Sequence, residues 1–136
     1  MKAQLWAIPL TGTKGDATGL VAWKQPAGAP DQTSPIIVND RVYMVSSGGI
    51  LSCLDLADGH ILWKERIGSD FAASPLLAGG HLYFFAAEGP CTVIKPGDTF
   101  QKIATNELKA GCMASPAVVG KSLIVRTKTH LYRIEN

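Results

Sequence analysis

The stretch SPIIVNDRVYMV at residues 34–45 decides the fold, because it returns as SPLLAGGHLYFF at 74–85 and as SPAVVGKSLIVR at 115–126. Each copy begins with Ser-Pro, runs through a few apolar residues to a polar or glycine turn, and continues into a second run rich in Val, Tyr, Phe and Ile. Short apolar runs on either side of a tight turn are typical of a β-hairpin. The copies are 40 and 41 residues apart, a period typical of repeat architectures with one supersecondary unit per repeat.

Two more columns of similar sequence follow each hairpin. The third column, in which alternating apolar residues predict one face turned toward a core, is QLWAIPL (4–10), ILSCLDL (50–56), PCTVIKP (90–96) and HLYRIEN (130–136). The fourth column is GLVAWKQ (19–25), HILWKER (60–66) and, less regularly, QKIATNE (101–107). Four short strands per 40-residue unit, with no helical period, predict the blade of a β-propeller.

The fold class expected is therefore all-β, a partial β-propeller of roughly three four-stranded antiparallel blades. Residues 1–136 form one domain in this interpretation, and its units contribute strands as follows: 1–33 the third and fourth strands of a blade, 34–73 a full blade, 74–114 a full blade, and 115–136 the first three strands of a blade. Propellers usually have 4 to 8 blades. We therefore expect oligomerisation or additional chain to complete the ring.

The segment LDLADGHILWK at 54–64 makes the repeat recognisable. It resembles the pyrroloquinoline-quinone-like (quinoprotein-type) propeller repeat, in which a strand ends in Asp, a turn contains Gly, and a Trp lies in the next strand. Asp55, Gly59 and Trp63 stand at those positions. The resemblance covers nearly the whole chain and extends to the C-terminal half of bacterial proteins built from this repeat.

The outer units depart from the motif. The first keeps Gly19 and Trp23 but has Pro9 in the Asp column, and its turn is six residues longer, with Lys14 and Asp16 in the insert. We expect that insert to be a long loop, the kind of segment in which function concentrates. The third unit carries Lys95 and Ala104 in the Asp and Trp columns, so there the motif is lost.

The motif residues are interpreted as structural. Gly59 supplies the positive φ that a tight turn requires, and the Asp55 and Asp58 side chains accept hydrogen bonds from turn amides. Trp23 and Trp63 bring large apolar faces to the seams between blades, where each ring buries about 150–250 Å². A ligand-stacking role for these two indoles is the less favoured alternative.

Composition narrows the classes of function. The net charge of +2 offers no basic stripe for a nucleic-acid backbone. No window holds the ~20 apolar residues of a membrane span, and no signal peptide is evident, although relatives with this repeat are mostly periplasmic or secreted; the compartment stays open. Cys53, Cys91 and Cys112 lack metal-site spacing and are expected to be buried apolar residues, with their redox state left open.

No catalytic, cofactor-binding or metal-binding residue is predicted. The Gly120-Lys121-Ser122 triplet is interpreted as a hairpin turn rather than a phosphate loop. His60, His81 and His130 fall in turns at both ends of the blades, too far apart for one metal site. Ser34, Ser74 and Ser115 begin their units without a nucleophile-elbow motif. The resemblance implies a relation to quinoprotein enzymes, which hold their quinone with a vicinal disulfide and a calcium ion. The chain has no Cys-Cys pair, so these cofactor-binding residues are not carried over to it.

The function expected is that of a non-catalytic propeller scaffold or protein-interaction module. The alternative is a fragment or subunit of a quinoprotein-type oxidoreductase that depends on pyrroloquinoline quinone. The partners expected are a second copy, in a dimer that shares blades, or another protein, because open blade edges present unpaired backbone groups. Nucleic acid and membrane are not expected as partners.

Overall fold

Thirteen strands in four antiparallel sheets make up a computed structural model of the chain that describes residues 3–10 and 15–135. Sheet 1 contains β1 (Leu5–Ala7) and β2 (Trp23–Gln25). Sheet 2 contains β3 (Ile36–Val38), β4 (Arg41–Val45), β5 (Ile50–Asp55) and β6 (Ile61–Arg66). Sheet 3 contains β7 (Leu76–Ala78), β8 (His81–Phe85), β9 (Pro90–Lys95) and β10 (Gln101–Glu107). Sheet 4 contains β11 (Ala117–Val119), β12 (Ser122–Arg126) and β13 (Leu131–Glu135).

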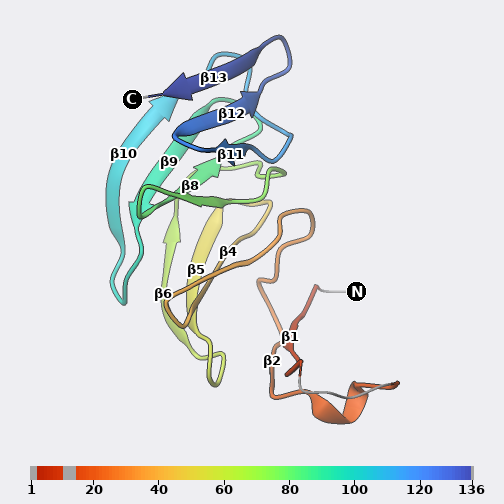
Figure 1. Cartoon of the computed structure of the whole chain (residues 1–136). Helices are drawn as coiled ribbons and strands as arrows, with labels where there is room; N and C mark the ends of the chain where they lie inside the picture. Colours follow the sequence, from red (N-terminus) through yellow and green to blue (C-terminus); the bar gives the residue numbers. More distant parts are fainter. Residues whose placement is uncertain (1–2, 11–14, 136) are drawn as a thin grey trace.

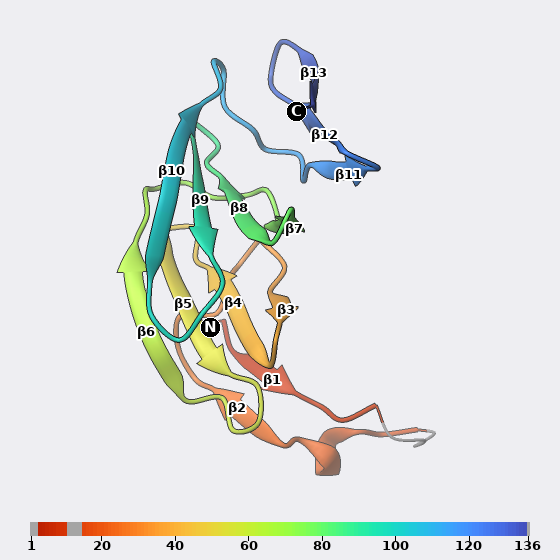
Figure 2. The same cartoon turned by 60° about the vertical axis from the view of Figure 1, so that its left-hand side comes forward.

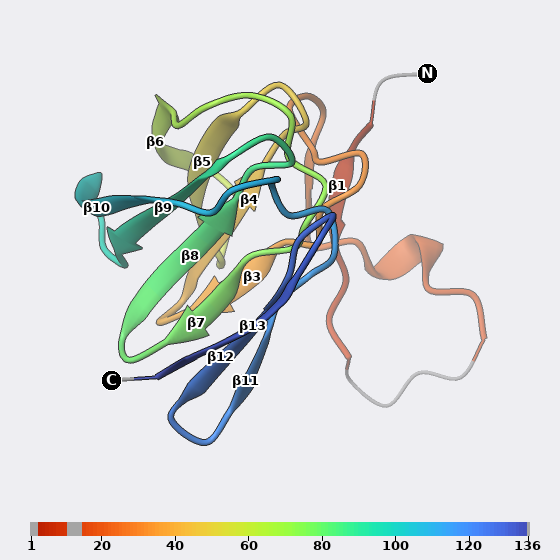
Figure 3. The same cartoon turned by 90° about the horizontal axis from the view of Figure 1, so that it is seen from above.

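Each full sheet has its strands in chain order, joined to their neighbours by antiparallel pairing. The sheets follow one another as blades, with β6 and β10 along one side (Figures 1 and 2) and β3 and β7 along the other (Figure 2). Seen from above, sheet 4 lies beyond sheet 3, and the short helix at residues 18–20 lies away from the other strands (Figure 3). The partial propeller predicted from the repeat is confirmed, with no closed ring among the described sheets. The boundaries of the four units stay a prediction.

The hydrophobic core is divided among the three seams between successive sheets. Met44 and Leu54 of sheet 2 pack with Leu5 and Trp23 of sheet 1. The largest cluster joins sheets 2 and 3, the next joins sheets 3 and 4, and the side chain of Val125 is the buried contribution of sheet 4. Burial of apolar area between sheets therefore holds the blades to one another.

The third strand of each full blade differs from its expected one-sided pattern. Positions 51–54 of β5 and 91–94 of β9 are buried without interruption. Alternation disappears because these strands lie inside their sheets and have another sheet packed on each face, as in sheets that are covered on both sides. In β13 the pattern differs again, with most residues exposed.

The hairpin turns have the backbone that their sequences predict. Asn39 and Asp40 have φ of 49° and 59°, and Gly79 and Gly80 have φ of 55° and 76°. Two successive positive φ angles are the mark of a type I′ turn, whose twist matches that of paired strands.

The first unit departs from the expected fourth column. Residues Thr18–Leu20 form a short 3-10 helix, η1, so β2 begins only at Trp23. Gly19 lies in η1 without the positive φ of Gly59 and therefore does not repeat the turn role of that residue. Lys14 of the insert lies outside the described residues, whereas Asp16 lies within them. No helix of the described residues is long and apolar enough to span a membrane.

Candidate functional site

The seam between sheets 2 and 3 is built around the turn that connects β9 to β10. The indole Nε1 of Trp63 donates to the carbonyl oxygen of Gly97 at 3.1 Å, and its ring meets Phe100 edge to face, with centroids 5.4 Å apart. The backbone N–H of Gly97 donates in turn to the Tyr43 hydroxyl at 2.8 Å. Side chains of sheet 2 therefore bind this turn of sheet 3.

A charged side chain and a buried polar one of sheet 2 also contact this turn. Arg41 bridges Asp55 of its own sheet, at 2.9 Å, and Asp98 of the seated turn, at 2.7 Å. The Arg41 guanidinium lowers the pKa of the Asp98 carboxyl. Tyr43 is fully buried, and burial together with the neighbouring Cys53 thiol raises its pKa to about 12. The phenol therefore stays protonated at neutral pH and serves as a hydrogen-bonding group rather than a base.

The seam between sheets 1 and 2 uses the same device. Trp23 donates from Nε1 to the carbonyl oxygen of Leu56 at 2.8 Å, and its ring lies directly against the Cα of Gly59. Both residues belong to the turn between β5 and β6. In each of these two seams, a tryptophan from the fourth strand of one blade holds the corresponding turn of the next.

The turn that begins at Asp55 is stabilised by its own carboxylates. Asp55 accepts from the backbone N–H of Ala57 at 2.8 Å, and Asp58 accepts from that of His60 at 3.0 Å. Gly59 has φ of 75°. These contacts agree with the structural interpretation of the motif, which stays a prediction until the residues are substituted.

The three serines that open the units form a ladder from blade to blade. The Ser74 hydroxyl accepts the backbone N–H of Ser34 at 2.9 Å, and the Ser115 hydroxyl accepts that of Ser74 at 3.0 Å. Sequence reasoning placed these serines at the start of a strand and missed their mutual contact. The constant spacing of Ser-Pro was the signal that could have suggested it.

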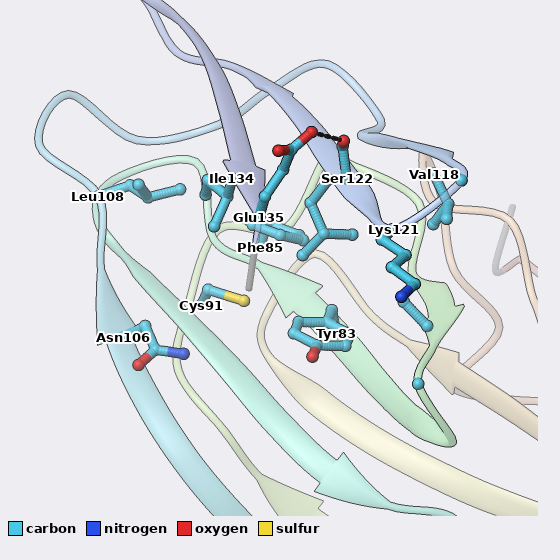
Figure 4. A pocket seen from close by; sticks show the side chains of 14 residues that line it. Tyr83, Phe85, Cys91, Asn106, Leu108, Val118, Lys121, Ser122, Ile134 and Glu135 are labelled. Carbon is cyan, nitrogen blue, oxygen red and sulfur yellow. Dashed lines mark hydrogen bonds between the residues drawn. The ribbon is translucent and has the colours of Figure 1, made fainter.

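The seam between sheets 3 and 4 lacks the tryptophan, because Ala104 stands in register where Trp63 stands in sheet 2. A cavity of about 700 Å³ opens in this seam. Sheet 3 lines it chiefly with Tyr83, Cys91 and Asn106, and sheet 4 with Val118 and Ile134 (Figure 4). We treat this cavity as the candidate functional site.

Polar groups gather on the sheet 4 wall of the cavity. The Ser122 hydroxyl is hydrogen-bonded to the Glu135 carboxylate, as Figure 4 shows. The Nε–H of Arg133 donates to the same carboxylate at 2.5 Å and to the Ser122 hydroxyl oxygen at 3.2 Å. Lys121 also lines the cavity. The site is thus apolar at the blade surfaces and charged near the end of β13.

The three histidines and three cysteines considered in the sequence do not form one site. His60 contacts Asp58, His81 contacts the carbonyl oxygen of Gly79, and His130 contacts Thr129. Among the residues that the structure describes, no group of three His, Cys, Asp or Glu side chains is placed to hold a metal ion. Cys53, Cys91 and Cys112 are free and buried, and burial, joined by the charge of Cys112, raises the pKa of the Cys91 thiol to about 12.

The residues present do not fit a bound quinone with calcium. Asp55, Asp58 and Asp98 lie at the turns, where they pair with Arg41 or with backbone amides. Among the described residues, no three acidic, His or Cys side chains are placed to hold one cation. The cysteines are far apart in the sequence and unpaired. No reaction step through such a cofactor follows from these side chains.

Comparison with known families and structures agrees with the repeat. A family model described as outer membrane protein assembly factor BamB matches residues 13–136. The chain belongs to this family. No curated protein sequence matches it with significance.

Solved structures of this family and of quinone enzymes share the fold. BamB from Moraxella catarrhalis superposes with a TM-score of 0.73 at 19% identity, over 97% of this chain and 40% of that one. A europium-containing methanol dehydrogenase gives 0.62 at 14% identity, over 76% of this chain and 21% of that one. The quinohemoprotein alcohol dehydrogenase ADHIIG from Pseudomonas putida HK5 gives 0.61 at 21%, over 76% and 18%.

These likenesses concern the fold, because all three identities are low. The chain spans 40% of the length of the Moraxella catarrhalis BamB and about a fifth of each dehydrogenase. A propeller of this kind accommodates both assembly factors and enzymes, so the activity has to be argued from the site.

Proposed function

We propose that this BamB-family chain is a non-catalytic scaffold that binds other proteins through the exposed side of sheet 4. The observation that carries the proposal is the apolar surface of that sheet. Leu131 is 72% exposed, whereas the aligned Leu51 and Cys91 of the full blades are buried. Val119 is 63% exposed, whereas the aligned Val38 is buried. Apolar side chains that no neighbouring blade covers favour contact with another protein.

The edge of β13 that no described strand covers also supports the proposed binding of other proteins by sheet 4. Its counterparts β5 and β9 each have a strand on both sides, whereas β13 pairs with β12 alone among the described strands. An exposed edge strand offers unpaired N–H and C=O groups to a strand from another polypeptide.

Photo-crosslinking in bacterial cells tests the proposal. A photoreactive amino acid at Leu131 is expected to give discrete crosslinked protein bands, whereas the same amino acid at exposed Lys64 of sheet 2 should give few. Purified protein supplied with pyrroloquinoline quinone and calcium should neither develop quinone absorbance nor reduce a dye. Dye reduction that depends on the quinone would favour the oxidoreductase alternative instead.

Self-association is a second form of the proposal. Sheet 1 contains the strands of the third and fourth columns, and sheet 4 those of the first three, so two copies could share blades. A dimer predicts a mass in solution near twice 14.4 kDa. Light scattering that gives a single copy over a wide range of concentration would leave another protein as the partner.

The family's description refers to assembly at the outer membrane, and we extend it to this chain as part of the same proposal. Fractionation of cells producing the native gene product would test whether the protein resides in the envelope.

A further inference from the structure

We propose that Cys91 and Cys112 form a disulfide bond that joins sheet 3 to the segment leading into sheet 4. In this structure both thiols are free, so the proposal concerns the oxidised form of the chain. It does not depend on the proposed scaffold function. The packing of the two residues, the equivalent positions in sheet 2 and the seam in which they lie all support it.

The two cysteines lie on neighbouring segments of backbone. Ala86, which follows β8, donates its N–H to the carbonyl oxygen of Pro90 at 3.0 Å and accepts the N–H of Cys112 at 3.1 Å. Pro90 immediately precedes Cys91 in β9. A disulfide joins Cα atoms that are usually about 4.4–6.8 Å apart, so it requires two adjacent segments. The shared hydrogen bonds with Ala86 make the segments at residues 91 and 112 neighbours, although they are far apart in the sequence.

The side chains of Cys91 and Cys112 are both buried in the apolar cluster between sheets 3 and 4. Burial, and after it the charge of Cys112, raises the pKa of the Cys91 thiol to about 12, and the influence of one charge on another falls off with distance. Cys53 belongs to the cluster between sheets 2 and 3 instead, where its Sγ contacts the carbonyl oxygen of Gly97 at 3.9 Å. The cysteine that packs with Cys91 is therefore Cys112, and Cys53 has no cysteine beside it in its cluster.

The preceding blade has larger apolar residues at both equivalent positions. Cys91 aligns with Leu51 in the third strand, and Cys112 aligns with Phe71, each three residues before the serine of the next Ser-Pro. Leu51 and Phe71 are fully buried members of one cluster. The later blade thus has two much smaller thiols in place of both members of a leucine–phenylalanine pair. A covalent bond between the two sulfur atoms supplies the cohesion that the larger pair supplies by packing.

The seam that this disulfide strengthens is the one without a tryptophan. Trp23 and Trp63 each bind a turn across one of the other two seams, whereas Ala104 stands at the equivalent position of sheet 3. Cys112 lies in the connection between β10 and β11, where the chain passes from sheet 3 to sheet 4. A bond to Cys91 holds this connection against β9. The disulfide thus stabilises a seam in which the indole contact is missing.

Formation of the bond requires an oxidant of the disulfide class. One cysteine thiolate attacks the external disulfide and releases one of its thiolates, and the second cysteine thiolate then displaces the other. The two protons of the protein thiols pass to the two released thiolates, and the external disulfide gains two electrons. Burial raises the pKa of both Cys91 and Cys112, which disfavours the reactive thiolate in the folded chain. We therefore expect the bond to form while the chain folds, in an oxidising compartment such as the bacterial periplasm.

Peptide mapping of the refolded full chain tests the pairing. The reduced chain is refolded from urea with oxidised and reduced glutathione, its remaining thiols are blocked with N-ethylmaleimide, and it is digested with trypsin. Cys91 falls in peptide 67–102, Cys112 in peptide 110–121 and Cys53 in peptide 42–64. We expect peptides 67–102 and 110–121 to be joined by a reducible bond and peptide 42–64 to be alkylated. The same oxidation in denaturing urea should give at least five-fold less of this pair.

Urea denaturation measures what the bond does for the seam. We expect the oxidised chain to have a midpoint about 1 M higher than the reduced chain. Cys53→Ala should keep this difference, and Cys91→Ala should remove it. The oxidised and reduced forms of the unsubstituted chain give the same comparison without requiring a variant to fold.

Four outcomes would overturn the proposal. These are alkylation of all three cysteines after refolding, a bond that includes Cys53, an equal yield of the pair in denaturing urea, or equal midpoints for the oxidised and reduced chains. Crosslinking from Leu131 in cells tests the scaffold function separately, so either proposal can fail while the other stands.

Discussion

Trp23 lies so close to Gly59 that a Cβ placed on the glycine would come within 2.4 Å of Cε3 of the indole. The contact joins the fourth strand of one blade to the turn of the next, and it requires both a flat ring and a residue without a side chain. The glycine of the motif is thus needed for space as well as for backbone conformation. Gly59 and Trp63 are close in the sequence of one blade, but the tryptophan that contacts Gly59 is Trp23 of the preceding blade.

Gly59→Ala should therefore destabilise the chain more than a turn conformation alone would explain. Gly80 is the matched control, since its φ of 76° equals the 75° of Gly59 within a degree and an added Cβ meets no atom within 4 Å. We expect about 1 kcal/mol for Gly80→Ala from the left-handed backbone, and about 2–4 kcal/mol for Gly59→Ala because overpacking adds to it. Urea denaturation followed by circular dichroism measures both. Equal losses would show that Trp23 yields without cost.

Truncation of Trp63 should weaken the seam between sheets 2 and 3 in two separable steps. Trp63→Phe keeps a ring against Phe100 but removes the hydrogen bond to the Gly97 carbonyl, a loss of about 1 kcal/mol. Trp63→Ala also removes the ring, and we expect a total of about 3 kcal/mol. The free energy of unfolding is the measurement, and an indistinguishable pair of variants would contradict the role of the indole N–H.

The sequence predicts the blades well because the repeat is visible in residue types that have local effects. Ser-Pro, the Asn39-Asp40 and Gly79-Gly80 turns, and the short apolar strands each act within a few residues. The contacts between blades are harder to predict because they join residues 34 to 57 positions apart, as in Trp63 with Gly97 and Arg41 with Asp98. The cavity could have been suspected from Ala104 in the tryptophan column, although a missing ring by itself does not indicate whether the neighbours close over it.

The serine ladder gives a prediction about a contact that the sequence did not disclose. Ser74→Ala leaves the N–H of Ser34 without its acceptor, and Ser115→Ala does the same to the N–H of Ser74. Each should cost about 1 kcal/mol, the usual contribution of one hydrogen bond. Ser69→Ala, in an exposed position of the segment between sheets 2 and 3, is the control and should be neutral. If the three variants unfold at the same urea concentration, the ladder contributes nothing to stability.

Alkaline pH should destabilise the chain through its buried acids. The pKa of Cys91 rises from 9.0 to about 12, and that of Tyr43 from 10.0 to about 12, chiefly because burial disfavours the charged forms. Between pH 9 and 12 the folded state therefore binds more protons than the unfolded state, so stability is full below pH 9 and falls as the pH rises toward 12. A tenfold difference in proton affinity between the two states corresponds to about 1.4 kcal/mol. Unfolding free energies at pH 7.5, 9 and 10.5 under reducing conditions measure the decline, and Cys91→Ala should flatten it between pH 9 and 10.5 whatever its effect at neutral pH. An identical pH slope in this variant would mean that the Cys91 thiol ionises as readily in the folded chain as in the unfolded one.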